Sequence, residues 1–513
     1  MRQSAVLFLL VLVVILAFGF QGARGIWQPD EGYYVGIAVK MNDQGQYLIP
    51  KLDEEIFLDK PPLLYWGIVG GMKLFGQSEF AVRIFSGLCF ALTVFLIFLL
   101  GRSFSGRFED GFWAALIYAT MIVPFIAAGF VTPDTPLTLF TTLSMLAFWH
   151  SIRPGVKYAN VWKMILCAAV GLGFLTKGPA ALIPCGAMFI YLLTTGKMVR
   201  YFLTPWAIAG VAIFVLLGLN WYVYISLKLP GSAAYFFDSM VWGRLISGKY
   251  QRNPGLAGAL IYVAALLAGT LPWSVLWYAT DKGLGRYFFA GTWKDLPKDP
   301  VGLLLACWIV VPLILLCLAS SKLGLYALPV FPALALATVK LLPETAPSGR
   351  MEELFSRASS NRFFFVLLWT GLLLISRPIL GAIPSANDCR RLWGELKPYI
   401  PNGEYEIVAA DERVDGLSFY GAIEVENITQ KTNPYPTFMP METVQFELDD
   451  MKKDNFPHLF LVQGAKHLSE IQNILSASSW QIQRVALKND RHLLVCLPQP
   501  EIPRSPFENS IRK

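Results

Sequence analysis

Charged residues are scarce in this chain of 513 residues: Asp, Glu, Lys and Arg make up 15% of it, whereas a typical soluble domain has about 25%. Hydrophobic residues make up 55%, and this imbalance excludes a water-soluble enzyme. The net charge of +7 is modest for the length. It fits loops that face a membrane surface better than nucleic-acid binding, which needs basic residues clustered on one face. The sequence therefore predicts an integral membrane protein that binds no nucleic acid.

Acidic residues are absent from the long apolar runs, of which about eleven have membrane-spanning length. A carboxylate at the bilayer centre costs about 2.5–3.5 kcal/mol, which ion pathways tolerate for their function. Its absence argues against an ion-coupled transporter. The runs also lack the alternating pattern of a β-barrel. The predicted fold class is mainly α, a polytopic membrane protein with about 11–13 transmembrane helices. The runs lie near residues 4–20, 80–100, 112–129, 135–150, 163–176, 179–194, 205–225, 258–279, 301–319, 325–341 and 363–383.

A soluble region is expected to follow the last run. We predict that residues 1–384 form the transmembrane domain and residues 385–513 a small soluble α/β domain. Cys389 and Cys496 are the only cysteines of that domain and could form a disulfide if it is exported. The sequence does not supply their separation, so the disulfide stays open. The strands of this soluble domain are expected at 404–410, 417–429, 458–464, 480–488 and 491–497.

Basic residues in the short loops predict the orientation of the chain. They lie on one side if the N-terminus is cytoplasmic and if the first run is a retained anchor rather than a cleaved signal peptide. The loop 21–79, with its amphipathic helices, and the domain 385–513 then face outward. The basic loop residues predicted to lie on the cytoplasmic side are Arg102, Arg107, Arg153, Lys157, Lys163, Lys197, Arg200, Lys282, Arg286, Lys294, Lys298, Arg350, Arg357 and Arg362.

Acidic residues gather in the outward segments. Asp30 and Glu31 precede a helix-like stretch, and Asp134 follows a Thr-Pro pair just before the fourth apolar run. Each could simply stabilise a helix N-terminus. Taken alone, neither pattern decides between that role and catalysis.

Three short outward segments, 57–66, 174–179 and 320–326, each contain one lysine. Lys60 follows Asp59 and precedes two prolines, which hold it on a stiff backbone. Lys177 and Lys322 lie in short outward turns. Any one of the three could be an interfacial lysine that extends its ammonium group to water. Together they are more typical of a site for an anionic, lipid-borne headgroup, because ammonium groups bind phosphate.

These motifs resemble those of the polyprenyl-phosphate-dependent glycosyltransferases with the GT-C fold. The likeness is strongest to the 4-amino-4-deoxy-L-arabinose lipid A transferases, alongside the protein O-mannosyltransferases, and covers most of the chain. The Lys-Pro-Pro-Leu-Leu-Tyr-Trp sequence is its most specific part, whereas Asp-Glu alone is a weak signal. The matching segments are Asp30-Glu31 with Tyr34, Phe57–Trp66, Phe75–Arg83, Thr132–Asp134, Leu172–Pro179, Leu271–Trp273, Lys322–Pro329 and Leu417–Gly421.

The resemblance implies roles for the acidic residues. Asp30, followed by Glu31, matches the acidic position of the first outer loop, which serves catalysis in the family. Asp134 matches a second acidic position of the active site. We therefore take Asp30, Glu31 and Asp134 as candidate catalytic residues.

The resemblance also implies a site for the donor phosphate. Lys60 matches a residue that binds this phosphate, Arg244 corresponds to a second contact, and Tyr326 lies in a motif bordering the donor pocket. Lys177 and Lys322 complete the candidate phosphate-binding set. Cations placed there would stabilise the charge that develops as the sugar leaves the phosphate.

One motif departs from the family pattern. Val241 stands where the family often has a His that helps to hold a metal, and the only His before residue 385 is His150, predicted to be cytoplasmic. A His-ligated metal is therefore not expected, and the sequence establishes no cofactor. Asp59 could bind a divalent ion with Asp30 or Glu31, or could equally pair with a nearby lysine.

The predicted function is a glycosyltransferase of the bacterial inner membrane. It would move a sugar, with 4-amino-4-deoxy-L-arabinose as the candidate, from undecaprenyl phosphate to lipid A or a related envelope acceptor on the periplasmic face. Its expected partners are this lipid-linked donor, the acceptor and the membrane lipids. One alternative is transfer to protein hydroxyls or another glycan. A lipid-linked-sugar flippase is a second alternative, but it would need a polar core, and many transporters also contain an inverted repeat. We find neither in the sequence.

Overall fold

Two compact units make up the computed structural model. The first comprises Met1–Arg24, Met41–Pro50 and Phe57–Ile383, and the second comprises Gly25–Lys40, Lys51–Ile56 and Pro384–Lys513. The structure describes residues 2–52, 55–243, 252–275, 277, 298–340, 361–410, 412–421, 425–428, 438, 444–451, 453, 456–476 and 480–498.

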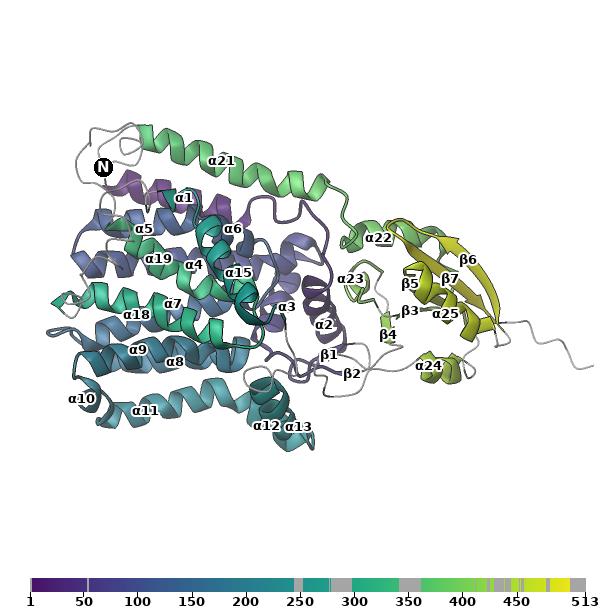
Figure 1. The fold of residues 1–513 in the computed structure, drawn as a ribbon, viewed down its shortest axis with the longest axis horizontal. Helices are drawn as coiled ribbons and strands as arrows, with labels where there is room; N and C mark the ends of the chain where they lie inside the picture. Colours follow the sequence, from purple (N-terminus) through teal and green to yellow (C-terminus); the bar gives the residue numbers. More distant parts are fainter. Residues whose placement is uncertain are drawn as a thin grey trace, which may run out of the picture. The chain divides into compact units, whose positions relative to one another are not determined.

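The first unit is helical (Figure 1). Each apolar run predicted from the sequence contains helix where it is described, so the mainly α fold is confirmed. The α-helices are α1 (Arg2–Phe18), α3 (Leu63–Phe75), α4 (Glu79–Ser105), α5 (Phe108–Thr120), α6 (Ile122–Ala128), α7 (Asp134–Ile152), α8 (Ala159–Lys177), α9 (Ile183–Thr194), α10 (Met198–Phe202), α11 (Pro205–Phe214), α12 (Asn220–Lys228), α13 (Ser232–Tyr235), α15 (Gly255–Gly269), α18 (Pro300–Leu318), α19 (Phe331–Val339) and α21 (Asn361–Ala382). Tighter or wider helical turns occupy η1 (Gly178–Leu182), η2 (Val215–Leu219), η3 (Phe236–Trp242) and η6 (Gly324–Val330).

Five helical stretches among the described residues are long and apolar enough to cross a membrane, and six if α5 and α6 count as one span bent by 67°. The bend falls at Met121, whose backbone is extended between the two helices. Several other predicted runs form shorter apolar helices, including α1 and α15. The number of 11–13 transmembrane helices therefore stays a prediction.

Packing in the first unit separates a buried core from an apolar surface. Trp308, Tyr118 and Phe148 are among its fully buried side chains. Helix α21 instead exposes Phe364 and Leu367 together with other large apolar residues. Such a surface is costly in water but suits a lipid environment, which agrees with the predicted membrane location.

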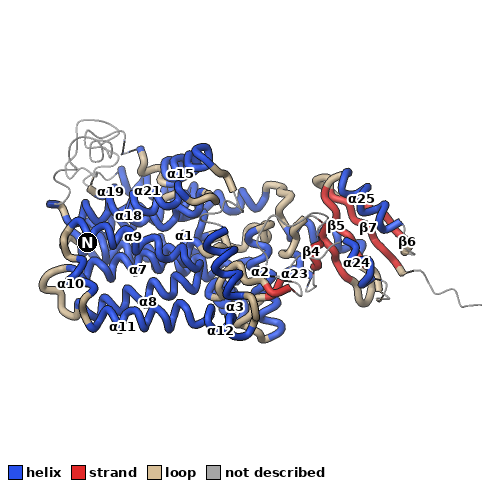
Figure 2. The backbone as a smooth tube through the Cα atoms, turned by 60° about the horizontal axis from the view of Figure 1, so that its bottom comes forward, coloured by secondary structure: helices blue, strands red, loops and turns tan. Residues whose placement is uncertain are grey.

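The second unit contains a five-stranded sheet in the order β4-β3-β5-β7-β6 (Figure 2). Strand β3 pairs in parallel with β4 and β5, whereas β7 pairs antiparallel with β5 and β6. A separate two-stranded sheet joins β1 (Lys51–Leu52) and β2 (Glu55–Ile56). The strands of the large sheet are β3 (Glu406–Ala410), β4 (Val425–Ile428), β5 (His458–Gln463), β6 (Gln481–Ala486) and β7 (Arg491–Leu497).

Short helices accompany this sheet, namely α22 (Cys389–Leu396), α23 (Leu417–Gly421), α24 (Val444–Met451) and α25 (Ala465–Ser476). Helix α2 (Asp30–Gln44) begins in the second unit and ends in the first. The predicted strand 417–429 is wrong in its first part, which forms α23; only Val425–Ile428 is a strand.

The two cysteines of the C-terminal region are free and buried. Cys389 belongs to an apolar cluster with Leu392 and Leu417, whereas Cys496 belongs to another cluster with Met451 and Leu468. Because they pack in different clusters, the disulfide that the sequence left open is not formed in this structure.

Candidate active site

Helices α7 and α8 bring two predicted site residues together. Asp134 is the first residue of α7 and Lys177 the last of α8, and the two helices pack against each other. The Lys177 Nζ atom donates a hydrogen bond to Asp134 Oδ1 at 2.5 Å. Both side chains are largely buried, with 12% of Lys177 and 6% of Asp134 exposed. Water therefore screens this ion pair only weakly.

Tyr326 contributes an aromatic face to this pair. It lies in the η6 turn, and the Lys177 ammonium is 4.2 Å from the centroid of its ring. A cation over a ring face is attracted by the negative charge density of the π system. Residues 134, 177 and 326 thus come together from three separate elements, and we call them the Lys177 cluster.

Lys322 precedes η6 and is only 3% exposed. Its Nζ atom donates to the Ala319 carbonyl oxygen at 2.7 Å. Its backbone is held on both sides, since its N–H donates to the Arg252 carbonyl and its carbonyl accepts from Asn253 Nδ2. Among the described residues, no carboxylate forms an ion pair with Lys322. Because a buried charge is costly without a counter-charge, this ammonium is a strong candidate for binding an anion.

Lys60 occupies a different setting from Lys322. Its Nζ atom is 2.5 Å from Oδ2 of the neighbouring Asp59, and both side chains are mostly buried. Pro61 and Pro62 follow and lead into α3, where the fixed proline backbone suits a helix start. Burial and then the negative charge of Asp59 raise the pKa of Tyr65, which stays a neutral phenol.

Asp59 was also a candidate metal ligand. In the described part of the chain, it belongs to no group of three or more potential ligands; the group that qualifies is Glu406, Glu447 and His458. The contact with Lys60 matches the alternative that the sequence had left open, in which Asp59 pairs with a lysine. Asp59 as a metal ligand stays a prediction.

Asp30 and Glu31 lie in the second unit, in the first turn of α2. Asp30 is exposed. Glu31 is 2% exposed, and one of its carboxylate oxygens accepts a hydrogen bond from the Trp27 N–H at 3.0 Å. Glu31 therefore fixes the turn that presents Asp30, which agrees with the helix-start role weighed for this pair.

Contacts within the second unit hold this turn, and they were not predicted from the sequence. The Ile26 N–H donates to the Tyr420 hydroxyl at 2.9 Å, and the Cys389 N–H donates to the Ile26 carbonyl at 2.9 Å. The Gln28 N–H donates to the Asn387 carbonyl, also at 2.9 Å. The motif 417–421 is visible in the sequence, but nothing local relates it to a residue 394 positions away. The C-terminal region thus helps to shape the Asp30 turn.

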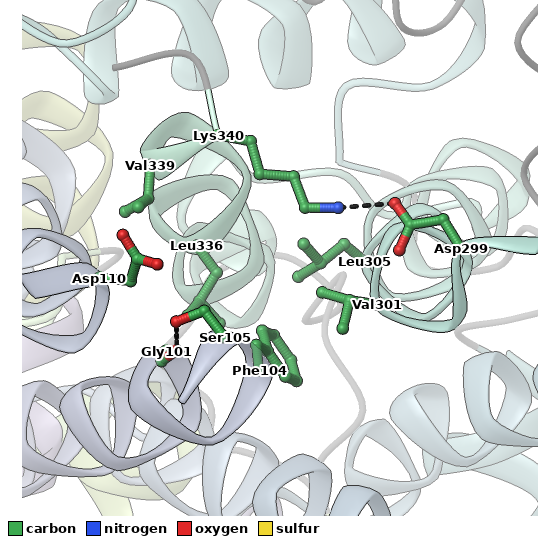
Figure 3. A pocket seen from close by; sticks show the side chains of 10 residues that line it. All are labelled: Gly101, Phe104, Ser105, Asp110, Asp299, Val301, Leu305, Leu336, Val339 and Lys340. Carbon is green, nitrogen blue, oxygen red and sulfur yellow. Dashed lines mark hydrogen bonds and ion pairs between the residues drawn. The ribbon is translucent and has the colours of Figure 1, made fainter. Parts of the chain in front are cut away.

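Arg244 lies outside the described residues, so its predicted phosphate contact stays a prediction. A cavity of about 230 Å³ lies elsewhere in the first unit, between the ends of α4, α18 and α19 (Figure 3). Lys340 and Asp299 form an ion pair at its edge, with Nζ and Oδ2 2.7 Å apart. The cavity contains none of the predicted site residues.

That cavity also lies far from the Lys177 cluster. The Trp149 indole near the end of α7 donates to Ser103 near the end of α4, and the cavity lies beside that end of α4. Asp134 is at the opposite end of α7, about 25 Å away along a 19-residue helix. The cavity is therefore no part of the candidate site.

Comparison with known proteins identifies similar sequences and structures. Residues 59–224 match a family profile described as dolichyl-phosphate-mannose-protein mannosyltransferase. A relative from Proteus mirabilis, undecaprenyl phosphate-alpha-4-amino-4-deoxy-L-arabinose arabinosyl transferase 2, is 29% identical over 72% of this chain and 66% of its own length. The transferase of that name from Photorhabdus laumondii is 28% identical over 71% of this chain and 64% of its own length. The match thus spans just under two thirds of these relatives.

Solved structures show the same fold. The crystal structure of ArnT from Cupriavidus metallidurans bound to undecaprenyl phosphate superposes with a TM-score of 0.74, at 18% identity, over 96% of this chain and 97% of that chain. The chain therefore has the fold of this ArnT structure. The resemblance to the polyprenyl-phosphate-dependent transferases, and within them to the aminoarabinose transferases, is confirmed.

Proposed function

We propose that the chain is a glycosyltransferase that takes one sugar from undecaprenyl phosphate and transfers it to an acceptor of the bacterial envelope. The sugar we propose is 4-amino-4-deoxy-L-arabinose, and the acceptor is lipid A. The names of the relatives and the ArnT fold support this choice. The observation that carries it is the buried ammonium of Lys322, which has no carboxylate partner among the described residues.

The donor phosphate is the natural counter-charge for Lys322. When the bond from the anomeric carbon to the phosphate oxygen breaks, the leaving polyprenyl phosphate gains negative charge. A fixed cation in surroundings of low dielectric stabilises that charge more than it stabilises the intact donor. Lys60 and Lys177 would adjust this field, although their own carboxylate partners already offset much of their charge.

Asp30 would act on the acceptor in this proposal. A lipid A phosphate is already ionised near neutral pH, so Asp30 would need only to orient it during attack with inversion at the anomeric carbon. A hydroxyl acceptor would instead need Asp30 as a general base. Asp30→Asn is therefore expected to reduce transfer far more with a hydroxyl than with a phosphate acceptor.

A donor and acceptor screen tests this function. The full chain purified in detergent would be given a panel of undecaprenyl-phosphate sugars and either lipid A, peptides or envelope glycans, and mass spectrometry would follow the freed lipid phosphate and the acceptor. A mass gain on lipid A that requires Lys322 supports the proposal. A mass gain on peptide hydroxyls would mean that the acceptor is a protein and not lipid A. The match to a protein mannosyltransferase profile makes protein the second candidate acceptor. Movement of the donor lipid across vesicles without sugar transfer would overturn the assignment in favour of a flippase.

We also propose that the chain lies in the inner membrane with a cytoplasmic N-terminus and with residues 385–513 in the periplasm. The apolar helices and the relatives support the membrane location. Reporter fusions after residue 102 and after residue 498 test the orientation. A reporter active only in the periplasm should work at the second position and fail at the first, and the reverse result would contradict this topology.

A further inference from the structure

Three side chains of the second unit gather beside the large sheet, outside the site described above. Glu406 begins β3 and His458 begins β5, and the parallel register pairs these two residues directly. Both side chains therefore stand on the same face of the sheet. Glu447 joins them from α24, which packs on that face through Leu448 and Met451.

The distances between their ligand atoms suit a metal ion. His458 Nδ1 is 3.4 Å from Glu406 Oε2 and 3.4 Å from Glu447 Oε1. All three ligand atoms lie within 4.8 Å of one another. In a tetrahedral zinc site with bonds of about 2.0–2.1 Å, neighbouring ligand atoms are about 3.3–3.4 Å apart. The two separations from His458 Nδ1 match the edge of such a tetrahedron.

The burial of Glu447 points to a ligand in the same place. Its side chain is 2% exposed, yet its Oε1 atom, which faces His458, accepts no hydrogen bond from the described residues. A buried carboxylate oxygen without a hydrogen bond is costly, and a coordinated cation removes that cost. The His458 side chain is 1% exposed, whereas that of Glu406 is 27% exposed, so an ion could enter from the side of Glu406.

We propose that Glu406, Glu447 and His458 form a metal site for a divalent transition ion such as Zn²⁺. One imidazole nitrogen and two carboxylate oxygens are ligands that such ions accept. The His458 ring stacks on Phe456 with ring centres 5.0 Å apart and meets Trp480 edge-on at 5.5 Å. These two contacts fix the direction of Nδ1. The ion would fasten α24 to strands β3 and β5, independently of the sugar-transfer site.

Metal binding by the full chain in detergent tests this site. The protein would be stripped with a chelator and titrated with Zn²⁺ by calorimetry and with Co²⁺ by visible absorption, because tetrahedral Co²⁺ has characteristic bands. We expect the wild type to bind one more ion than His458→Gln. Glu447→Gln should keep the fold and weaken the affinity of that ion by at least about 10- to 100-fold, the loss that follows when a group that only orients a ligand is removed.

His492→Gln is the matched control. His492 is also buried in this sheet, with its Nε2 atom 3.6 Å from a single carboxylate, that of Asp490. This variant should keep the extra ion and its Co²⁺ bands. Equal stoichiometry and affinity in wild type and His458→Gln would overturn the proposal. So would an imidazole signal of His458 that responds to pH but not to Zn²⁺, because a proton would then hold the two glutamates together.

Discussion

The two compact units differ in the charge of the candidate site residues that they hold. In the first unit the candidate groups include cations held among apolar helices: Lys177 is paired with the candidate carboxylate Asp134, and Lys322 has no carboxylate partner among the described residues. In the second unit the candidate groups are the carboxylates of Asp30 and Glu31, and Glu31 is held by a backbone N–H. A buried cation in low dielectric suits a departing phosphate, whereas an exposed carboxylate on a fixed turn suits a polar acceptor. The difference therefore divides the proposed reaction into a donor half and an acceptor half.

Removing the partner of Lys177 should have the largest effect. Asp134→Leu leaves a buried ammonium without a counter-charge, and we expect it to lower the free energy of unfolding by about 3–5 kcal/mol. Thermal unfolding in detergent measures this loss. The double variant Asp134→Leu/Lys177→Met should recover most of the stability, because it removes both charges from the apolar surroundings. A double variant as unstable as the single one would show that the ion pair is not what Asp134 contributes.

Unlike Asp134→Leu, Lys322→Met should weaken donor binding without lowering stability. It removes a charged hydrogen bond to the donor phosphate worth about 1.5–3 kcal/mol, or about 10- to 100-fold in donor affinity. Stability should stay the same or rise, since no described carboxylate loses a partner. Donor binding and thermal unfolding would be measured together.

Lys340→Met is the control for Lys322. Lys340 pairs with Asp299 beside the separate cavity, and this variant should leave donor affinity unchanged. If donor affinity were unchanged in Lys322→Met as well, Lys322 would not bind the donor phosphate.

Tyr420→Phe examines how the second unit holds its carboxylates. It removes the hydroxyl that accepts from the Ile26 N–H, and an unsatisfied amide there should cost about 1–3 kcal/mol. Sugar transfer should fall because the Asp30 turn loosens, while donor affinity should stay unchanged. If Tyr420→Phe lost as much donor affinity as Lys322→Met, the reaction could not be divided into a donor half and an acceptor half. Tyr405→Phe is the control, because among the described residues no hydrogen bond links its hydroxyl to this turn.

The sequence predicted the donor half better than the acceptor half. The single outward lysines are a local signal, and the family resemblance implied that Asp134 and Tyr326 belong to the same active site; Asp134, Lys177 and Tyr326 are found together. The contact between Ile26 and Tyr420 joins positions 394 residues apart, and no local pattern encodes it. The strand expected from 417 was wrong for a related reason. A short segment with alternating apolar residues fits a strand or a helix equally well, and tertiary packing decides.

The smallest predicted effect concerns the core beneath the sheet of the second unit. Burial and then the charge of Glu447 raise the pKa of the Cys496 thiol from 9.0 to about 12. A raised thiol pKa stabilises the folded state fully below about pH 9 and loses that contribution as the pH rises toward 12. The loss should be about 1.4 kcal/mol per pH unit in this window. In protein stripped of metal ions, Cys496→Ala should therefore lose less stability than the wild type between pH 9 and pH 10, measured as the shift in thermal midpoint. An identical shift in both proteins would mean that the thiol ionises as easily in the folded chain as in the unfolded one. The core of the second unit would then admit water, unlike the surroundings of Lys177.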